Sequence, residues 1–205
     1  MNKVLIALFI LYSSATFSQT PEMSKEEFVN QVLDEVIDSG FSKYYLLDEA
    51  PPCSFKRYDY DEWVKYGLKK MITIDILNEL AKNAYRDTAN SHWVEEKLDG
   101  AVCVHKDQAE NILNPLSQIK NDPSLSEKEK KKAIRKLAKE WKKKPAEEKV
   151  VFCFSKPEFT DDFQYAVMNI SYRCDDKACG MGTTYLFMQT DNGWKVAGKM
   201  VSWSN

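Results

Sequence analysis

The chain has 205 residues, 43% of them hydrophobic, and its 29 basic and 31 acidic residues give a formal net charge of −2. A chain of this length can bury a core without the help of a metal, and so small a net charge argues against a dedicated nucleic-acid-binding protein. We therefore expect one globular domain with no metal and no cofactor.

The first 18 residues have the organisation of a bacterial signal peptide. Lys3 provides the positive charge at the start, residues 4–12 are apolar, and residues 13–18 are mostly small and polar. The apolar stretch is too short to remain as a membrane anchor, and no second long apolar run follows, so we expect no transmembrane anchor. The sequence therefore predicts a signal peptide over 1–18 and an exported protein, periplasmic or secreted, with a single α+β domain over 19–205.

Three helices begin at clear capping residues. Ser24 with Glu27, and Ser126 with Glu129, have the capping-box spacing, in which the serine and the glutamate each satisfy a free backbone N–H. Thr73 is placed to cap a third helix. Apolar residues follow all three caps at helical spacing, so each cap predicts the start of an amphipathic helix.

Residues 24–146 are expected to form the mainly helical part, and residues 150–205 an antiparallel sheet. Two short apolar segments, 41–47 and 98–105, do not decide between strand and helix. We expect the helices to pack on the C-terminal sheet, which gives an α+β fold.

An aromatic-rich segment follows the first helix and contains Tyr58, Tyr60, Trp63 and Tyr66 among several carboxylates. The ordinary interpretation is a short amphipathic helix whose rings enter the core. The functional interpretation is a platform on which a carbohydrate or a peptide stacks. These four residues are the candidate ligand- or partner-binding residues.

A lysine-rich helix is predicted over residues 126–144. Lys132, Lys136, Lys139 and Lys143 lie on one face at helical spacing and form a basic ridge. A solvated outer face explains the ridge, and so does contact with an anionic surface such as a membrane leaflet or an acidic partner.

Four strands are predicted at the C-terminal end, because β-branched and aromatic residues alternate with polar ones. They cover residues 150–154, 165–173, 183–188 and 194–203. Asn192-Gly193 indicates a type I′ hairpin turn, in which both central residues have positive φ. The result is an antiparallel meander of four strands.

The second predicted strand has two distinct faces. One face carries Ala166, Met168, Ile170 and Tyr172. The other carries Val167, Asn169, Ser171 and Arg173. We interpret this alternation as that of a half-buried strand.

Cys174 and Cys179 lie where two antiparallel strands converge, so we predict a disulfide that pins the hairpin loop. The alternative is half of a metal site, which needs two more ligands. The chain has five cysteines, an odd number, and the sequence does not decide whether two of Cys53, Cys103 and Cys153 also pair.

No catalytic constellation is evident. His92 and His105 are the only histidines, and no nucleophile motif, phosphate loop or metalloprotease motif is present. An enzyme requires that one of these histidines meet carboxylates in a cavity. That arrangement separates the enzyme hypothesis from the binding hypothesis.

Residues 185–188 and 192–196 resemble the closing hairpin of the nuclear transport factor two-like and cystatin-related α+β folds, in which helices precede a curved antiparallel sheet. The resemblance is confined to the C-terminal sheet, about a quarter of the chain, and implies a cupped sheet with no particular chemistry. The lysine-rich helix and the Cys174–Cys179 loop depart from that pattern.

Together these features favour a non-catalytic exported protein that binds an unknown protein or small ligand. A rigid loop and an aromatic patch are the predicted contact surfaces, because pre-ordered surfaces lose little entropy on binding. The competing hypothesis is a small hydrolase-like or isomerase-like enzyme with a pocket between sheet and helices.

Overall fold

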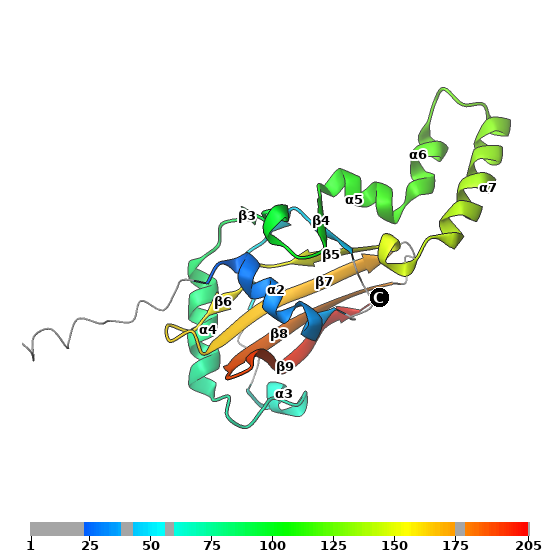
Figure 1. The fold of residues 1–205 in the computed structure, drawn as a ribbon. Helices are drawn as coiled ribbons and strands as arrows, with labels where there is room; N and C mark the ends of the chain where they lie inside the picture. The colour runs from blue at the N-terminus through cyan, green and yellow to red at the C-terminus, as the bar shows by residue number, and fades with distance from the viewer. Residues whose placement is uncertain (1–22, 38–42, 56–59, 175–178, 205) are drawn as a thin grey trace, which may run out of the picture.

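The computed structural model describes residues 23–37, 43–55, 60–174 and 179–204 of the chain (Figure 1). The helices are α2 (Lys25–Val36), α3 (Tyr60–Lys65), α4 (Ile74–Arg86), α5 (Lys106–Leu113), α6 (Pro115–Asn121) and α7 (Glu127–Lys143), with 3-10 helices η1 (Glu95–Lys97) and η2 (Ala146–Lys149). The strands are β1 (Tyr44–Leu47), β2 (Glu49–Ala50), β3 (Ser91–His92), β4 (Ala101–Val104), β5 (Val150–Phe154), β6 (Glu158–Phe159), β7 (Tyr165–Cys174), β8 (Gly180–Thr190) and β9 (Gly193–Ser204). The predicted signal peptide over 1–18 lies outside the described residues.

The three predicted caps are confirmed. Ser24 Oγ accepts a hydrogen bond from the Glu27 amide at 3.2 Å, and Ser126 Oγ accepts one from the Glu129 amide at 3.4 Å. Thr73 Oγ1 accepts one from the amide of Ile76 at 3.4 Å. Each bond satisfies one of the orphan donors in the first turn, and α2, α4 and α7 begin at the next residue.

The predicted α+β class and the C-terminal strands are confirmed. β5, β7, β8 and β9 are consecutive antiparallel neighbours, and β6 pairs with the first part of β7. The prediction of a purely antiparallel four-stranded sheet is wrong. The sheet has seven strands in the order β4-β1-β5-β7-β8-β9, with β6 beside β7, and β1 pairs in parallel with both β4 and β5.

Of the three added strands, β6 is a two-residue strand, whereas β1 and β4 come from the segments that the sequence left undecided between strand and helix. β1 and β4 are four residues each, and both are short apolar runs without clear alternation. Strands in parallel pairs are commonly covered on both faces and show that pattern. The part expected to be mainly helical therefore supplies one edge of the sheet.

The sheet has two covered faces. On the α2 face, Phe28 and Val32 of α2 pack against Phe154, Met168 and Phe187 of the strands. α2 lies across this face in Figure 1. The core on this side is rich in ring contacts, with Phe28 edge-on to Phe187 at 5.3 Å.

The opposite face, here called the α5 face, is covered in two parts. At one end Trp63 of α3 and Leu80 of α4 pack on Val167 and Leu186 of the sheet. At the other end the apolar side of α5 packs on Val151 of β5. Between these two clusters the sheet surface is polar, and the cavities described below lie there.

The hairpin between β8 and β9 differs from the type I′ turn that was predicted. Gly193 has a φ of 91°, but among the described non-glycine residues only Phe163 has a positive φ, so Asn192 does not. The strands are joined through Asp191 and Asn192, with Thr190 opposite Gly193. Glycine therefore relieves strain after the turn rather than within it.

Candidate functional site

The aromatic segment of α3 contributes mainly to the core. Trp63 is fully buried beside Phe55, with ring centroids 6.1 Å apart. Tyr60 is half-buried and its hydroxyl donates to the Ile72 carbonyl at 3.1 Å. Tyr66 is exposed, and Tyr58 lies outside the described residues. The described rings do not form a shared platform, because the side chain that anchors the segment points into the core.

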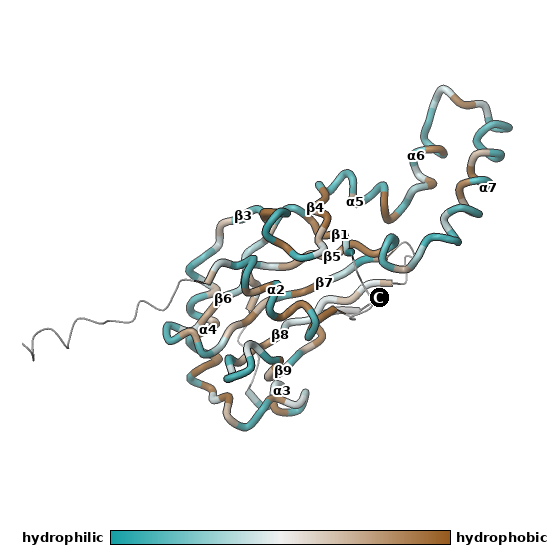
Figure 2. Tube along the Cα trace, in the orientation of Figure 1, coloured by the Kyte–Doolittle hydropathy of each residue, from teal (hydrophilic) through white to brown (hydrophobic). Residues whose placement is uncertain are grey.

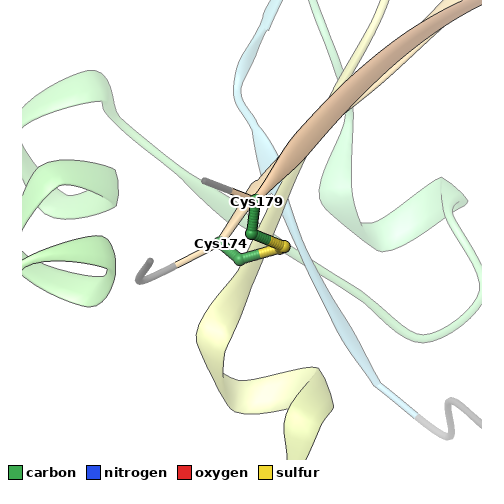
Figure 3. The surroundings of a disulfide bond; sticks show 2 residues. All are labelled: Cys174 and Cys179. Carbon is green, nitrogen blue, oxygen red and sulfur yellow. A yellow bond between two sulfur atoms is a disulfide. The ribbon is translucent and has the colours of Figure 1, made fainter. Parts of the chain in front are cut away.

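The predicted disulfide is present. Cys174 and Cys179 are bonded, with their Cα atoms 5.3 Å apart, at the open ends of β7 and β8 (Figure 3). Cys53, Cys103 and Cys153 are free thiols. The tip of the disulfide loop, residues 175–178, lies outside the described residues.

A cavity of about 520 Å³ lies between α5 and the sheet, and we call it the α5 cavity. Its apolar wall includes Ala109 and Leu113 of α5 and Val151 of β5. Its charged and ionisable lining is contributed by Asp48, Glu49, His92, His105, Lys106, Glu110 and Arg173. Cavities of this size, with an apolar body and a few polar groups, are typical of sites for small organic ligands.

Both histidines lie on this cavity, although they come from different elements. His92 of β3 is directly opposite Glu49 of β2, and His105 is the N-cap of α5. The His105 Nδ1 atom accepts from the Asp107 amide at 3.5 Å, which orients the ring at the start of the helix. Both histidines thus line one cavity with carboxylates, but both side chains are exposed, so the cavity encloses neither of them as an enzyme would require.

An ion pair joins α5 to the sheet at the far end of the cavity. Arg173 Nη1 lies 2.9 Å from Glu110 Oε1. Both side chains are more than half exposed, so the pair contributes at most about 1 kcal/mol to stability.

A second cavity of about 440 Å³ lies beside the first on the α5 face. Its polar lining consists of Ser54, Ser155, Asn169, Ser171, Thr183, Thr184 and Ser202, and none of its lining residues is charged. We call it the hydroxyl cavity. Its groups can both donate and accept hydrogen bonds, which suits a neutral polar ligand group.

The two cavities share part of their floor. Cys153 of β5 and Ser171 of β7 are paired across the strands, and both residues line both cavities. We call the combined depression the sheet groove. It offers a charged half beneath α5 and a neutral half over β7 and β8, with the Cys153 thiol between them.

The Cys153 thiol is not set up as a nucleophile. Burial raises the pKa of this thiol, and the nearby charge of Glu49 raises it further, while a hydrogen bond with Ser171 opposes the shift. A thiol with a raised pKa is protonated at neutral pH, and the thiolate is the reactive form. The thiol on the groove floor is therefore uncharged and a poor nucleophile at neutral pH.

Asn169 holds one wall of the hydroxyl cavity in place. Its Oδ1 atom accepts from the Ser54 amide at 2.6 Å and from the Cys53 thiol at 3.4 Å. Its Nδ2 atom donates to Thr184 Oγ1 at 2.9 Å. The side chain thus ties the loop after β2 to the middle of the sheet and defines the rim of the cavity.

A charged cluster that contains one buried lysine lies near the start of β6. Lys156 is 9% exposed and forms an ion pair with Asp87. Among the described residues, Glu158 Oε1 is buried without a hydrogen-bond partner. Burial and then the charge of Asp87 raise the pKa of Glu158 to about 7, while Lys156 opposes the shift. This carboxyl is therefore partly protonated at neutral pH.

The described part of the chain contains neither a cluster of metal ligands nor a membrane span. No group of three or more His, Cys, Asp or Glu residues there is placed to hold a metal ion. No helix among those same residues is long and apolar enough to span a bilayer.

Comparison with known proteins gives little further guidance. No protein-family model matches the chain, and no curated protein matches it. Among solved structures it is matched to the intermembrane space region of the chloroplast protein ARC6, with 14% identity over 51% of this chain and 100% of that chain. The TM-score of 0.16 is too low to support an argument about fold or function. The resemblance to nuclear transport factor two-like and cystatin-related folds stays a prediction.

Sequence reasoning missed the residues of the groove. In the sequence, Asn169 and Ser171 indicate only one face of a half-buried strand, and Cys153 bears only on the question of cysteine pairing. The available signal was the small size of the polar residues on that face. Small uncharged side chains in the middle of a long strand leave room above the sheet, whereas a solvated face usually carries long charged ones.

Proposed function

We propose that the protein is an exported, non-catalytic binding protein whose ligand lies in the sheet groove. The observation that carries the proposal is the shared floor of the two cavities at Cys153 and Ser171. A continuous depression with a charged half and a neutral half suits a small organic molecule that has an ionised end and a polar, uncharged end.

The walls of the groove favour binding over chemistry. The thiol on the floor has a raised pKa, and the Arg173–Glu110 pair satisfies two of the charged groups in the free protein. The groove is built on strands and on a helix rather than on loops alone, so little ordering accompanies binding.

Export is the other part of the proposal. It rests on the signal-peptide pattern of residues 1–18 and on the Cys174–Cys179 disulfide, which persists in oxidising compartments. Expression of the full chain in a bacterial host, followed by N-terminal sequencing of the extracytoplasmic fraction, tests it. Cleavage near residue 18 supports export, and an intact N-terminus in the cytoplasmic fraction contradicts it.

A fragment screen tests the binding site. A library of small polar molecules is scanned by thermal shift against the parent, Ser171→Leu and Gln189→Leu. Ser171→Leu places a branched side chain at the shared floor, whereas Gln189 is exposed on β8 outside the groove. Fragments that stabilise the parent and the Gln189 variant, and have lost their effect on the Ser171 variant, support the proposal. Equal stabilisation of all three proteins contradicts it.

A small enzyme is the second candidate function, and the presence of His92, His105 and Glu49 in the lining of one cavity favours it, although both histidines are exposed. A histidine held beside a carboxylate can act as a general base. The test is hydrolysis of chromogenic ester and glycoside substrates by the parent and by His92→Gln. Turnover that the substitution abolishes would replace the binding proposal with a catalytic one.

A further inference from the structure

The helical hairpin of α6 and α7 projects from the body of the molecule, and we call it the arm (Figure 1). α7 contains no fully buried residue, and its packing is against α6. The sheet groove and both core faces lie elsewhere. The proposed ligand site therefore gives no account of the composition of this helix.

The charge of the arm is opposite to that of the rest of the chain. α7 contains nine basic and three acidic side chains in 17 residues, which gives it a charge of +6. The whole chain has a charge of −2, so the remainder carries −8. A cationic helix thus extends from an acidic body.

The four ridge lysines are all exposed, and most of them have no ionic partner. Lys136 is paired with Glu140 at 3.9 Å. Within the described residues, Lys132, Lys139 and Lys143 make no ion pair. Repulsion between like charges at this spacing costs helix stability, and it is relieved when anions approach the ridge.

The apolar side of α7 is already used within the arm. Ile134, Leu137, Ala138 and Trp141 are half-buried, and α7 packs on α6. The Trp141 ring also lies under the ammonium groups of Lys144 and Lys149, at 5.3 and 6.0 Å. Figure 2 shows the rest of α7 as largely hydrophilic. The arm is therefore suited to adsorb on a charged surface and lacks a free apolar face for insertion into one.

We propose that the arm docks the protein on a membrane surface through anionic lipid headgroups. A straight row of lysines on a projecting helix matches an extended sheet of negative charge. The projection also matters, because it holds the acidic body away from that charge, and screening reduces repulsion beyond roughly 8 Å at physiological ionic strength.

A second copy of the chain fits the ridge less well. Within the part of the chain that the structure describes, the first-turn acidic side chains of α2, α4 and the two 3-10 helices belong to separate elements, not to one helix like the four lysines. An acidic protein surface would need carboxylates fixed at the spacing of the four lysines, whereas the anionic headgroups of a lipid surface can rearrange to match that spacing.

The test is co-sedimentation of the mature protein with vesicles. Vesicles of phosphatidylglycerol mixed with phosphatidylcholine are compared with vesicles of phosphatidylcholine alone, at about 0.1 M and about 1 M salt. We expect binding to the anionic vesicles at the lower salt only. Replacement of Lys132, Lys136, Lys139 and Lys143 by glutamine, a good helix former, should weaken it by up to roughly 1000-fold, since each lysine near the surface contributes about 1 kcal/mol.

A matched control separates the position of the charges from their number. Glutamine replaces Lys65, Lys69, Lys70 and Lys82, four exposed lysines of the body, so the total charge changes equally. This control should bind the anionic vesicles as the parent does. Equal loss in both variants, no loss in the ridge variant, or binding to neutral vesicles overturns the proposal.

Self-association is a further decisive outcome. Light scattering at low salt reports the oligomeric state of the parent and of the ridge variant. If the parent dimerises, the ridge variant is monomeric and neither binds vesicles, then the ridge contacts a second copy and the lipid proposal is wrong. Circular dichroism confirms that α7 is still helical in the ridge variant.

Discussion

Cys153 and Ser171 are opposite each other across β5 and β7, and together they form the floor on which two cavities meet. The pairing depends on the antiparallel register between these strands, since a slip of one residue would put the two side chains on opposite faces of the sheet. The same register puts Phe152 and Tyr172 on that opposite face, where their rings pack 6.0 Å apart. One strand pair therefore determines both a core and a groove.

Replacement of Asn169 by alanine should loosen the rim of the hydroxyl cavity. The Ser54 amide and Thr184 lose their partner, and we expect a loss of about 1–3 kcal/mol in the free energy of unfolding. Denaturant unfolding measures that loss, and faster hydrogen exchange at Ser54 should accompany it.

Asn169→Asp is the matched control. Aspartate retains the oxygen that accepts from Ser54 but has no Nδ2 donor for Thr184, so Ser54 should stay protected from exchange. If exchange at Ser54 is equally fast in both variants, the side chain does not tie this loop to the sheet.

Gly198 should not tolerate a larger residue, because β9 passes close to α3. A Cβ atom there would lie 3.0 Å from Leu68 Cδ1 and 3.4 Å from Trp63 Cε3. We expect Gly198→Ala to cost about 1–3 kcal/mol in unfolding free energy. Leu68→Val removes part of the crowding, so the double variant should lose less than the two single losses added together. Strict additivity in this cycle would show that the contact does not limit packing.

The raised pKa of Glu158 predicts a free energy of unfolding that falls as the pH rises. Its pKa is about 7 in the folded protein, against a usual value of 4.5, so the folded state holds a proton that the unfolded state releases. The associated stabilisation is present below about pH 4.5 and is lost as the pH rises through about 7. Because the group is only half-buried, we expect a change of about 1–2 kcal/mol.

Unfolding free energies measured across this pH range for the parent and for Glu158→Gln test the assignment. Glutamine does not titrate, so the fall should be smaller in the variant, which should also be the more stable of the two near pH 8. Parallel pH profiles would assign the effect to another group. Asp87 and Lys156 are the nearby charges, and the lowered pKa of Asp87 gives a change at more acidic pH.

The three free thiols of the native protein should react slowly with an alkylating reagent. Burial raises the pKa of Cys53 to about 12 and that of Cys103 to about 11, and it also raises that of Cys153. We therefore expect little alkylation of the native protein by iodoacetamide near neutral pH.

The number of alkylated cysteines in the unfolded protein, with and without a reductant, shows whether the disulfide is present. Three labels should appear after unfolding without a reductant, and five after reduction, because Cys174 and Cys179 are bonded. Five labels without a reductant would contradict the disulfide, and one label would indicate a second one.

The sequence predicted the strands and helices that have strong local signals. Capping by Ser24 and Ser126, and the alternation along β7, are properties of neighbouring residues and need no tertiary contact. β1 and β4 escaped a firm assignment because four apolar residues fit either a strand or a buried helix, and only their parallel pairing decides.

The candidate site was less predictable than the fold. Glu49, His92 and His105 are separated along the chain, and they line one cavity because β2 pairs with β3 while α5 follows β4 directly. Trp63 was predicted as a candidate binding residue because its ring suits a ligand platform. In the structure this ring is fully buried beside Gly198. Composition indicates which side chains are available, whereas the topology decides which of them face a cavity.

The central claim is that the sheet groove binds the ligand, and amide chemical-shift mapping tests it most directly. Fragments that stabilise the parent protein are titrated into the isotopically labelled mature chain. The account predicts that shifts concentrate at Cys153, Ser171 and Thr184, on the α5 face. Shifts that concentrate instead at Ile37 and Tyr185, which line an apolar cavity of about 290 Å³ on the α2 face, would contradict it.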